Sequence, residues 1–94
     1  MPEMTFTVLW PNGLRQQCYS PSLVVRDHLT VGDRYEIVDF VQRSRTALTE
    51  ASDRVMAKFG FACTSAAATL REIETTAAAF DSGTVRVLDL GGPR

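Results

Sequence analysis

The chain has 94 residues, 45% of them hydrophobic and 22% charged, and its formal net charge at pH 7 is −1. This composition excludes a disordered chain, and the length predicts one domain that buries roughly 60–65% of its unfolded surface. Because there is no run of lysine and arginine, we expect neither nucleic acid nor an anionic membrane surface as a partner.

The sequence has no stretch that approaches the ~18 apolar residues of a transmembrane helix. Residues 1–5, MPEMT, lack the basic and apolar regions of a signal peptide, so we expect a cytoplasmic protein. The two cysteines, Cys18 and Cys63, are then expected to be reduced thiols.

A β-hairpin is the first predicted element. Residues 4–10, MTFTVLW, alternate with period two and are rich in β-branched and aromatic side chains, which is typical of a half-buried strand. Pro11-Asn12-Gly13 is a hairpin turn signal, and residues 14–19 are the returning strand. Because the returning strand is the more polar, we expect it at a sheet edge and the first strand at the centre.

Helical signals follow the hairpin. Ser20 as N-cap and Pro21 at the first helical position predict a short helical turn over 21–28. A loop is expected over 30–33. A long amphipathic helix is predicted over 37–59, ended by Gly60. Its predicted apolar face consists of Val38, Val41, Leu48, Ala51, Val55, Met56 and Phe59.

Two more elements complete the prediction. A second helix begins at Thr64 or Ser65 and continues to about residue 80, and a third strand covers 84–90. We therefore predict an α+β fold in the order β-β-(short α)-α-α-β. Its three-stranded sheet, the N-terminal hairpin plus the C-terminal strand, packs on an antiparallel helix pair. Residues 1–90 form a single domain and 91–94 a flexible tail.

Cys18 is the first candidate for chemistry. It could be a thiolate activated near a helix N-terminus, with His28 as base, or a small apolar side chain packed inward. Strand alternation places Cys18 on the same face as Leu14, which favours packing. The same two interpretations apply to Cys63. Tyr19 and Ser20 add hydroxyl groups to this candidate ligand site.

A metal site built from Cys18, Cys63 and His28 is a weaker hypothesis. Zinc sites usually contain a C-x₂-C or H-x₃-H pair that prearranges two ligands, and the sequence contains neither. We therefore expect no metal and no cofactor.

Trp10, beside Pro11, is either a core residue or an exposed aromatic anchor for a partner. We keep it as the interface candidate, although a core position is favoured. Nucleotide-binding and hydrolase motifs such as G-x-G-x-x-G and G-x-S-x-G do not occur, which argues moderately against an enzyme and identifies no catalytic residue.

Several segments together resemble one known family. They are MPEMTFTVLWPNG, CYSPSLVV, DFVQRSRTAL, ASDRVMAKFGFAC and IETTAAAF. They resemble the small nitrogen-starvation-response proteins encoded in bacterial gene clusters beside a nitrilase, and the resemblance extends from Pro2 to about Leu88. It implies a context of nitrogen limitation and of nitrile or cyanide assimilation, and it supplies no catalytic residue.

These observations favour a non-catalytic accessory protein of such a pathway. It would act through contacts with a protein partner from the same pathway or with itself as a homodimer. The alternatives are a thiol-based ligand-binding or catalytic site around Cys18 with Tyr19, Ser20 and Cys63, or a metal-binding module.

Overall fold

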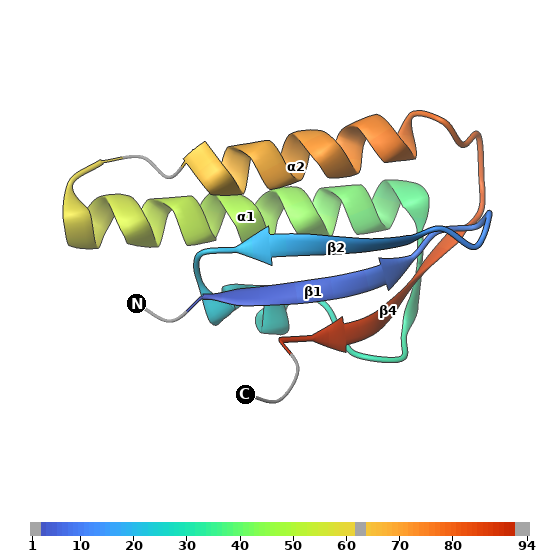
Figure 1. Cartoon of the computed structure of the whole chain (residues 1–94), viewed down its shortest axis with the longest axis horizontal. Coiled ribbons are helices and arrows are strands. Elements are labelled where there is room, and N and C mark those ends of the chain that lie inside the picture. The colour runs from blue at the N-terminus through green and yellow to red at the C-terminus, as the bar shows by residue number, and fades with distance from the viewer. Residues whose placement is uncertain (1–2, 62–63, 92–94) are drawn as a thin grey trace.

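The computed structural model describes residues 3–61 and 64–91 and has two layers, a sheet and a pair of helices that covers one of its faces (Figure 1). The strands are β1 (Met4–Leu9), β2 (Arg15–Ser20), β3 (Arg34–Glu36) and β4 (Thr84–Leu90), and the helices are the 3₁₀ helix η1 (Leu23–Asp27), α1 (Ile37–Phe59) and α2 (Thr64–Ala77). The α+β class is confirmed, and so are the two long helices.

The sheet has four strands in the order β2-β1-β4-β3, so the prediction of three strands was wrong. The additional strand, β3, has only three residues and pairs antiparallel with β4 through Tyr35 and Val85. Three residues are too few for a period-two pattern to stand out from the neighbouring helix. As expected, β1 lies inside the sheet and β2 at an edge.

The N-terminal hairpin forms as predicted. The Trp10 N–H donates to the Leu14 carbonyl at 2.8 Å and the Gly13 N–H donates to the Trp10 carbonyl at 2.9 Å. Gly13 has a φ of 87°, in the left-handed region that glycine adopts without strain. The side chain of Asn12 accepts a hydrogen bond from the Leu14 N–H at 3.0 Å and closes the turn.

A β-bulge in β4 changes which of its residues face the helices. Val8 of β1 pairs with Val87, but Thr7 pairs with Asp89, so β4 has one extra residue between these pairs. After the bulge Leu90 pairs with Phe6 and packs against the core. Strict alternation would have placed Asp89 on the core side instead.

Helix α1 has the predicted bounds, and the Gly60 N–H caps it by donating to the Met56 carbonyl at 2.8 Å. Its predicted apolar face is wrong in part, because Val38, Met56 and Phe59 are exposed. The buried residues instead are Ile37, Phe40, Ser44, Ala47, Leu48, Ala51 and Val55. They form one stripe at helical spacing, from which Val38 and Met56 are each displaced by ~100° around the helix axis.

Helix α1 extends beyond the end of the sheet, as Figure 1 shows. Its 23 residues span about 35 Å, whereas the six residues of β1 or β2 span about 20 Å. Phe59, although in phase with Val55, therefore lies where the helix has no sheet below it. Helix α2 runs back beside α1 and ends at Ala77, short of the predicted residue 80.

The short helix begins later than predicted. The N-cap of η1 is Ser22, whose hydroxyl accepts from the Val24 N–H at 3.3 Å. Ser20, the predicted cap, lies within β2, and its hydroxyl donates to the Ser22 carbonyl at 2.7 Å. At the other end of the chain, the N–H of Gly91 donates to the Thr5 carbonyl at 2.7 Å, so the first residue of the expected tail is hydrogen-bonded to β1.

Candidate functional site

Cys18, the central residue of the candidate thiol site, lies inside the core. It pairs with Phe6 on the face of the sheet that the helices cover, and it is 1% exposed. Burial, and to a lesser degree the carboxylate of Glu72, raises the pKa of Cys18 from 9.0 to about 12. The thiol is therefore protonated at neutral pH, which agrees with the packing interpretation and argues against a nucleophile.

The other members of the candidate thiol site do not converge on Cys18. Tyr19 lies on the opposite face of β2, and its hydroxyl donates to the Glu3 carboxylate at 2.8 Å. Ser20 is buried and uses its hydroxyl in the turn that leads into η1. Cys63 lies outside the described residues. The structure thus gathers no open pocket around Cys18, Tyr19 and Ser20.

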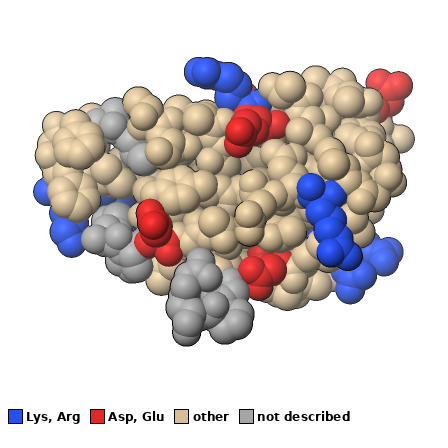
Figure 2. Space-filling model, viewed as in Figure 1, with Lys and Arg blue, Asp and Glu red and all other residues tan. Residues whose placement is uncertain are grey.

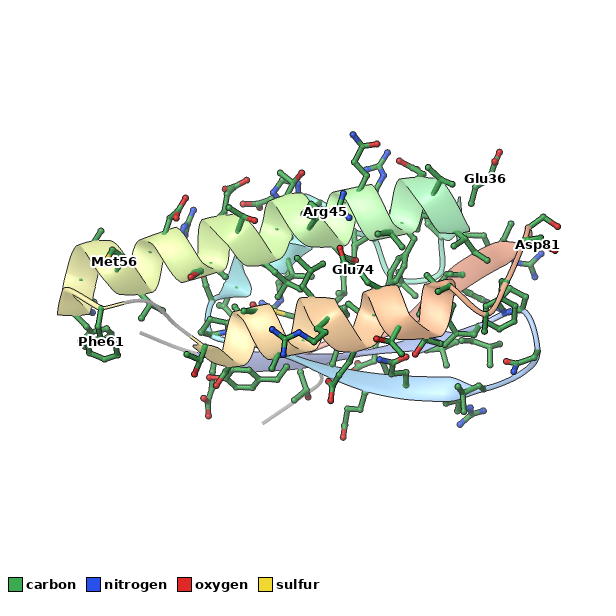
Figure 3. All side chains as sticks on the ribbon, turned by 90° about the horizontal axis from the view of Figure 1, so that it is seen from above. Glu36, Arg45, Met56, Phe61, Glu74 and Asp81 are labelled. Carbon is green, nitrogen blue, oxygen red and sulfur yellow. The ribbon has the colours of Figure 1, made fainter. Side chains whose placement is uncertain are left out.

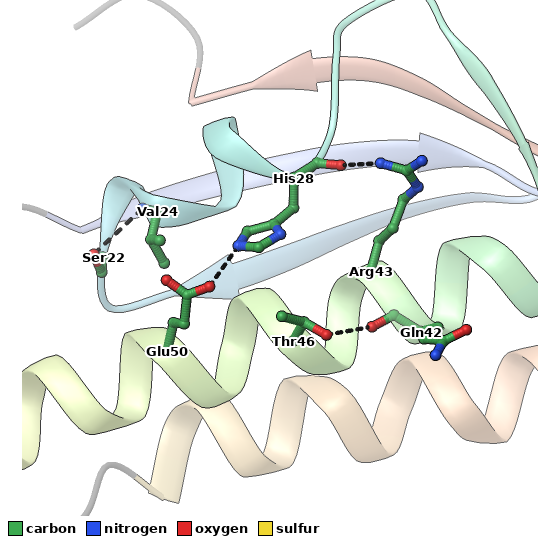
Figure 4. A network of polar contacts seen from close by, with 7 residues as sticks. All are labelled: Ser22, Val24, His28, Gln42, Arg43, Thr46 and Glu50. Atoms are coloured by element: carbon green, nitrogen blue, oxygen red, sulfur yellow. Dashed lines mark hydrogen bonds and ion pairs between the residues drawn. The ribbon is translucent and has the colours of Figure 1, made fainter.

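His28 joins η1 to helix α1 (Figure 4). Its ring Nε2 lies 2.8 Å from Oε1 of Glu50, and its carbonyl accepts from Nη1 of Arg43 at 3.1 Å. Arg43 also pairs with Asp39 one turn earlier, at 3.0 Å. The His28 side chain is therefore a tether between two elements in this structure. Within residues 3–61 and 64–91, no three His, Cys, Asp or Glu side chains are grouped as metal ligands.

Trp10, the predicted interface candidate, is a core residue and is 1% exposed. Its indole ring packs edge-on against Phe40 and stacks on Phe80, with centroid distances of 5.6 and 5.8 Å. Its N–H donates to the side-chain oxygen of Gln16 at 2.8 Å. A ring this deeply buried, with its donor already used within the chain, cannot anchor a partner.

The exposed apolar side chains at the free end of α1 form the feature that sequence analysis missed. Met56, Phe59 and Phe61 are 46%, 51% and 62% exposed. The rings of Phe59 and Phe61 lie 6.1 Å apart, and the Lys58 ammonium group lies 5.9 Å from the Phe59 ring. Figure 3 shows Met56 and Phe61 at the same end of the molecule. We call these three residues the apolar tip. Only the overhang of α1, read from the unequal lengths of helix and strands, could have predicted it.

A groove of about 450 Å³ runs along the open edge of the sheet, between β2 and α2. Its lining residues are Gln16, Gln17, Arg71, Glu72, Thr75 and Thr76. We call it the edge groove.

A second groove, of about 510 Å³, lies between the start of α1 and the end of α2. It is mainly apolar and includes Val38 and Phe80. The ion pair between Arg45 and Glu74, 2.7 Å long, lies across the two helices beside it (Figure 3).

The fold and these surfaces define a small two-layer α+β protein that buries its described thiol and exposes apolar side chains at one end. The chain belongs to the family described as Nitrogen starvation-induced protein NitG, whose model matches residues 5–90. This match confirms the resemblance to small nitrogen-starvation proteins. Neither the curated proteins nor the solved structures contain a match to the chain. Among the helices of the described residues, none combines the length and the apolar character that a membrane crossing requires.

Proposed function

We propose that this protein is a non-catalytic accessory component of the nitrogen-starvation response and acts by binding another protein through the apolar tip. Family membership supplies the context of nitrogen starvation. The resemblance found in the sequence narrows that context, as part of the same proposal, to a pathway that assimilates nitriles or cyanide.

The exposure of Phe59 and Phe61 is the observation that supports a protein contact. Aromatic side chains and methionine are enriched in the cores of protein interfaces. Phe59 and Phe61 are each more than half exposed to water. Burying these two rings against a partner would remove apolar surface from water and so contribute favourable free energy to association.

The surroundings of the apolar tip indicate the chemistry of its partner. Lys58 lies exposed in the last turn of α1, with its ammonium group 5.9 Å from the Phe59 ring, and Arg54 is exposed one turn earlier on the same helix. An apolar pocket with an acidic rim on the partner would match this arrangement of aromatic and basic groups.

Affinity capture from nitrogen-starved cells tests the proposal. The bait is the tagged chain, and it is compared with the double variant F59S/F61S and with the control V38S. Val38 is 79% exposed at the opposite end of α1, so its replacement removes apolar surface away from the tip. We expect a protein encoded in the same gene cluster to be captured by wild type and by V38S and lost with F59S/F61S. Equal capture by the tip variant, or no specific capture by wild type, contradicts the proposal.

A further inference from the structure

We propose that two copies of this chain associate through the edge of β2, around a two-fold axis at Gln17. The four strands of each copy would then form one antiparallel sheet of eight. This contact is separate from the apolar tip and does not depend on the partner proposed above.

The backbone of β2 is directed outward at Arg15 and Gln17. The hydrogen bond from the Trp10 N–H to the Leu14 carbonyl fixes the ladder, in which bonded and non-bonded pairs alternate. Gln16 and Cys18 are therefore bonded to β1, and the residues that alternate with them, Arg15 and Gln17, direct their N–H and C=O groups to the open side. In the described part of the chain, no residue from outside β2 hydrogen-bonds the Gln17 backbone there.

This edge lacks the devices that normally prevent strands from pairing across molecules. The middle of β2 is Gln16, Gln17 and Cys18, with no charge and no proline, and its pairing with β1 is free of bulges. The opposite edge differs, because β3 has three residues and two of them, Arg34 and Glu36, are charged. Figure 2 shows the side of the molecule with β2 and α2 as mostly uncharged surface.

The charges near the edge favour a second copy as the occupant. In an antiparallel pair with Gln17 facing Gln17 of the second copy, the strands run in opposite directions away from the axis. Arg15, two residues before Gln17, therefore lies opposite Tyr19 of the second copy, two residues after it. The Tyr19 hydroxyl donates to Glu3, so each Arg15 guanidinium lies near the Glu3 carboxylate of the other copy. The two-fold symmetry forms this contact twice, as an isologous interface requires.

The flank of α2 is also self-complementary. Arg71 and Glu72 line the edge groove, and in residues 3–61 and 64–91 neither makes an ion pair. The same axis turns this flank toward its copy, where each guanidinium can pair with the opposite carboxylate. The edge groove, about 450 Å³, is the space into which the second strand enters.

The mass of the purified chain in solution tests this interface, measured by light scattering over a wide range of concentration. We expect a species of twice the 10.4 kDa chain mass. The variant Q17P removes an outward N–H that the monomer does not use, and it should weaken the dimer by about 10- to 100-fold, since two symmetric hydrogen bonds are lost. The matched control is R34P, at the outward-facing residue of the β3 edge, and it should dimerise like wild type.

If Q17P fails to fold, exchanging the charges of Arg15 and Glu3 tests the same interface. In R15E, the new carboxylate at position 15 faces the Glu3 carboxylate of the other copy at both symmetric contacts, so the dimer should weaken. The double variant R15E/E3R places opposite charges together again and should restore the dimer. A monomeric wild type at all concentrations, or a Q17P or R15E protein that folds and dimerises like wild type, overturns the proposal. Because the experiment contains no other protein, its failure leaves partner binding at the apolar tip unaffected.

Discussion

Burial determines the chemistry of Cys18. Strand alternation predicted correctly that its side chain points toward the core, and the free thiol is small enough to pack there. The sequence could not predict that Glu72, distant along the chain, comes near enough to raise the pKa of the thiol further. Tertiary packing decides which residues of separate elements become neighbours, and a local sequence pattern cannot predict such contacts.

The raised pKa of Cys18 predicts a loss of stability at alkaline pH. An unfolded thiol loses its proton near pH 9.0, whereas the folded one keeps it to about pH 12, so the unfolded chain binds fewer protons between these values. The Cys18 contribution to the free energy of unfolding should be intact below pH 9.0 and fall by up to about 1.4 kcal/mol per pH unit above it.

Denaturant titrations at several alkaline pH values measure this dependence. The variant C18A serves as the control, because it removes the thiol and leaves every other titrating group in place. Its stability should fall less steeply with pH than that of wild type. Parallel curves for the two proteins would show that the Cys18 thiol is not buried.

At the scale of elements, long periodic segments were predictable and short irregular ones were not. The hairpin and α1 follow from patterns that persist over many residues. The strand β3 and the bulge in β4 are decided by pairing with a distant strand, through Tyr35 with Val85 and through Thr7 with Asp89. For α1, periodicity alone assigned Phe59 to the buried face, because the period of a helix carries no information on where the sheet beneath it ends.

The turn before β4 packs against the hairpin, and Gly83 is the residue at which they meet. Gly83 has a φ of 125°, and a Cβ at this position would lie 2.7 Å from Cγ of Pro11. Gly13 also has a positive φ, but a Cβ there would meet no atom within 4 Å. We predict that G83A destabilises the protein by about 3 kcal/mol and G13A by about 1 kcal/mol. Thermal or chemical unfolding measures both, and equal losses would contradict the close approach of Gly83 to Pro11.

The ion pair between Arg45 and Glu74 connects α1 to α2 on the surface. Both side chains are about half exposed, so solvent and salt screen their attraction. We predict that E74Q lowers the free energy of unfolding by less than about 1 kcal/mol, and that this difference shrinks in concentrated salt. The same titration on D53N is the control, because the Asp53 carboxylate is exposed on α1 and makes no ion pair among the described residues. A large, salt-independent loss for E74Q would contradict the prediction.

At the scale of the whole molecule, unequal element lengths leave one end of the helix layer without a sheet below it. The core stays closed around Trp10 and Phe40, while the apolar tip remains in water. The sequence predicted a protein contact from small size and from its resemblance to nitrogen-starvation proteins, and its only interface candidate was Trp10, for which a core position was favoured. The tip was missed because burial depends on what lies beneath a helix as well as on its periodicity.

The affinity of the captured partner for the purified chain tests the central claim most directly. Titration calorimetry with that partner should give a dissociation constant at least about tenfold higher for F59S/F61S than for wild type, because truncating two interface aromatics removes buried apolar contact. V38S should bind like wild type. Wild-type affinity of the folded F59S/F61S variant for the partner would contradict binding through the apolar tip.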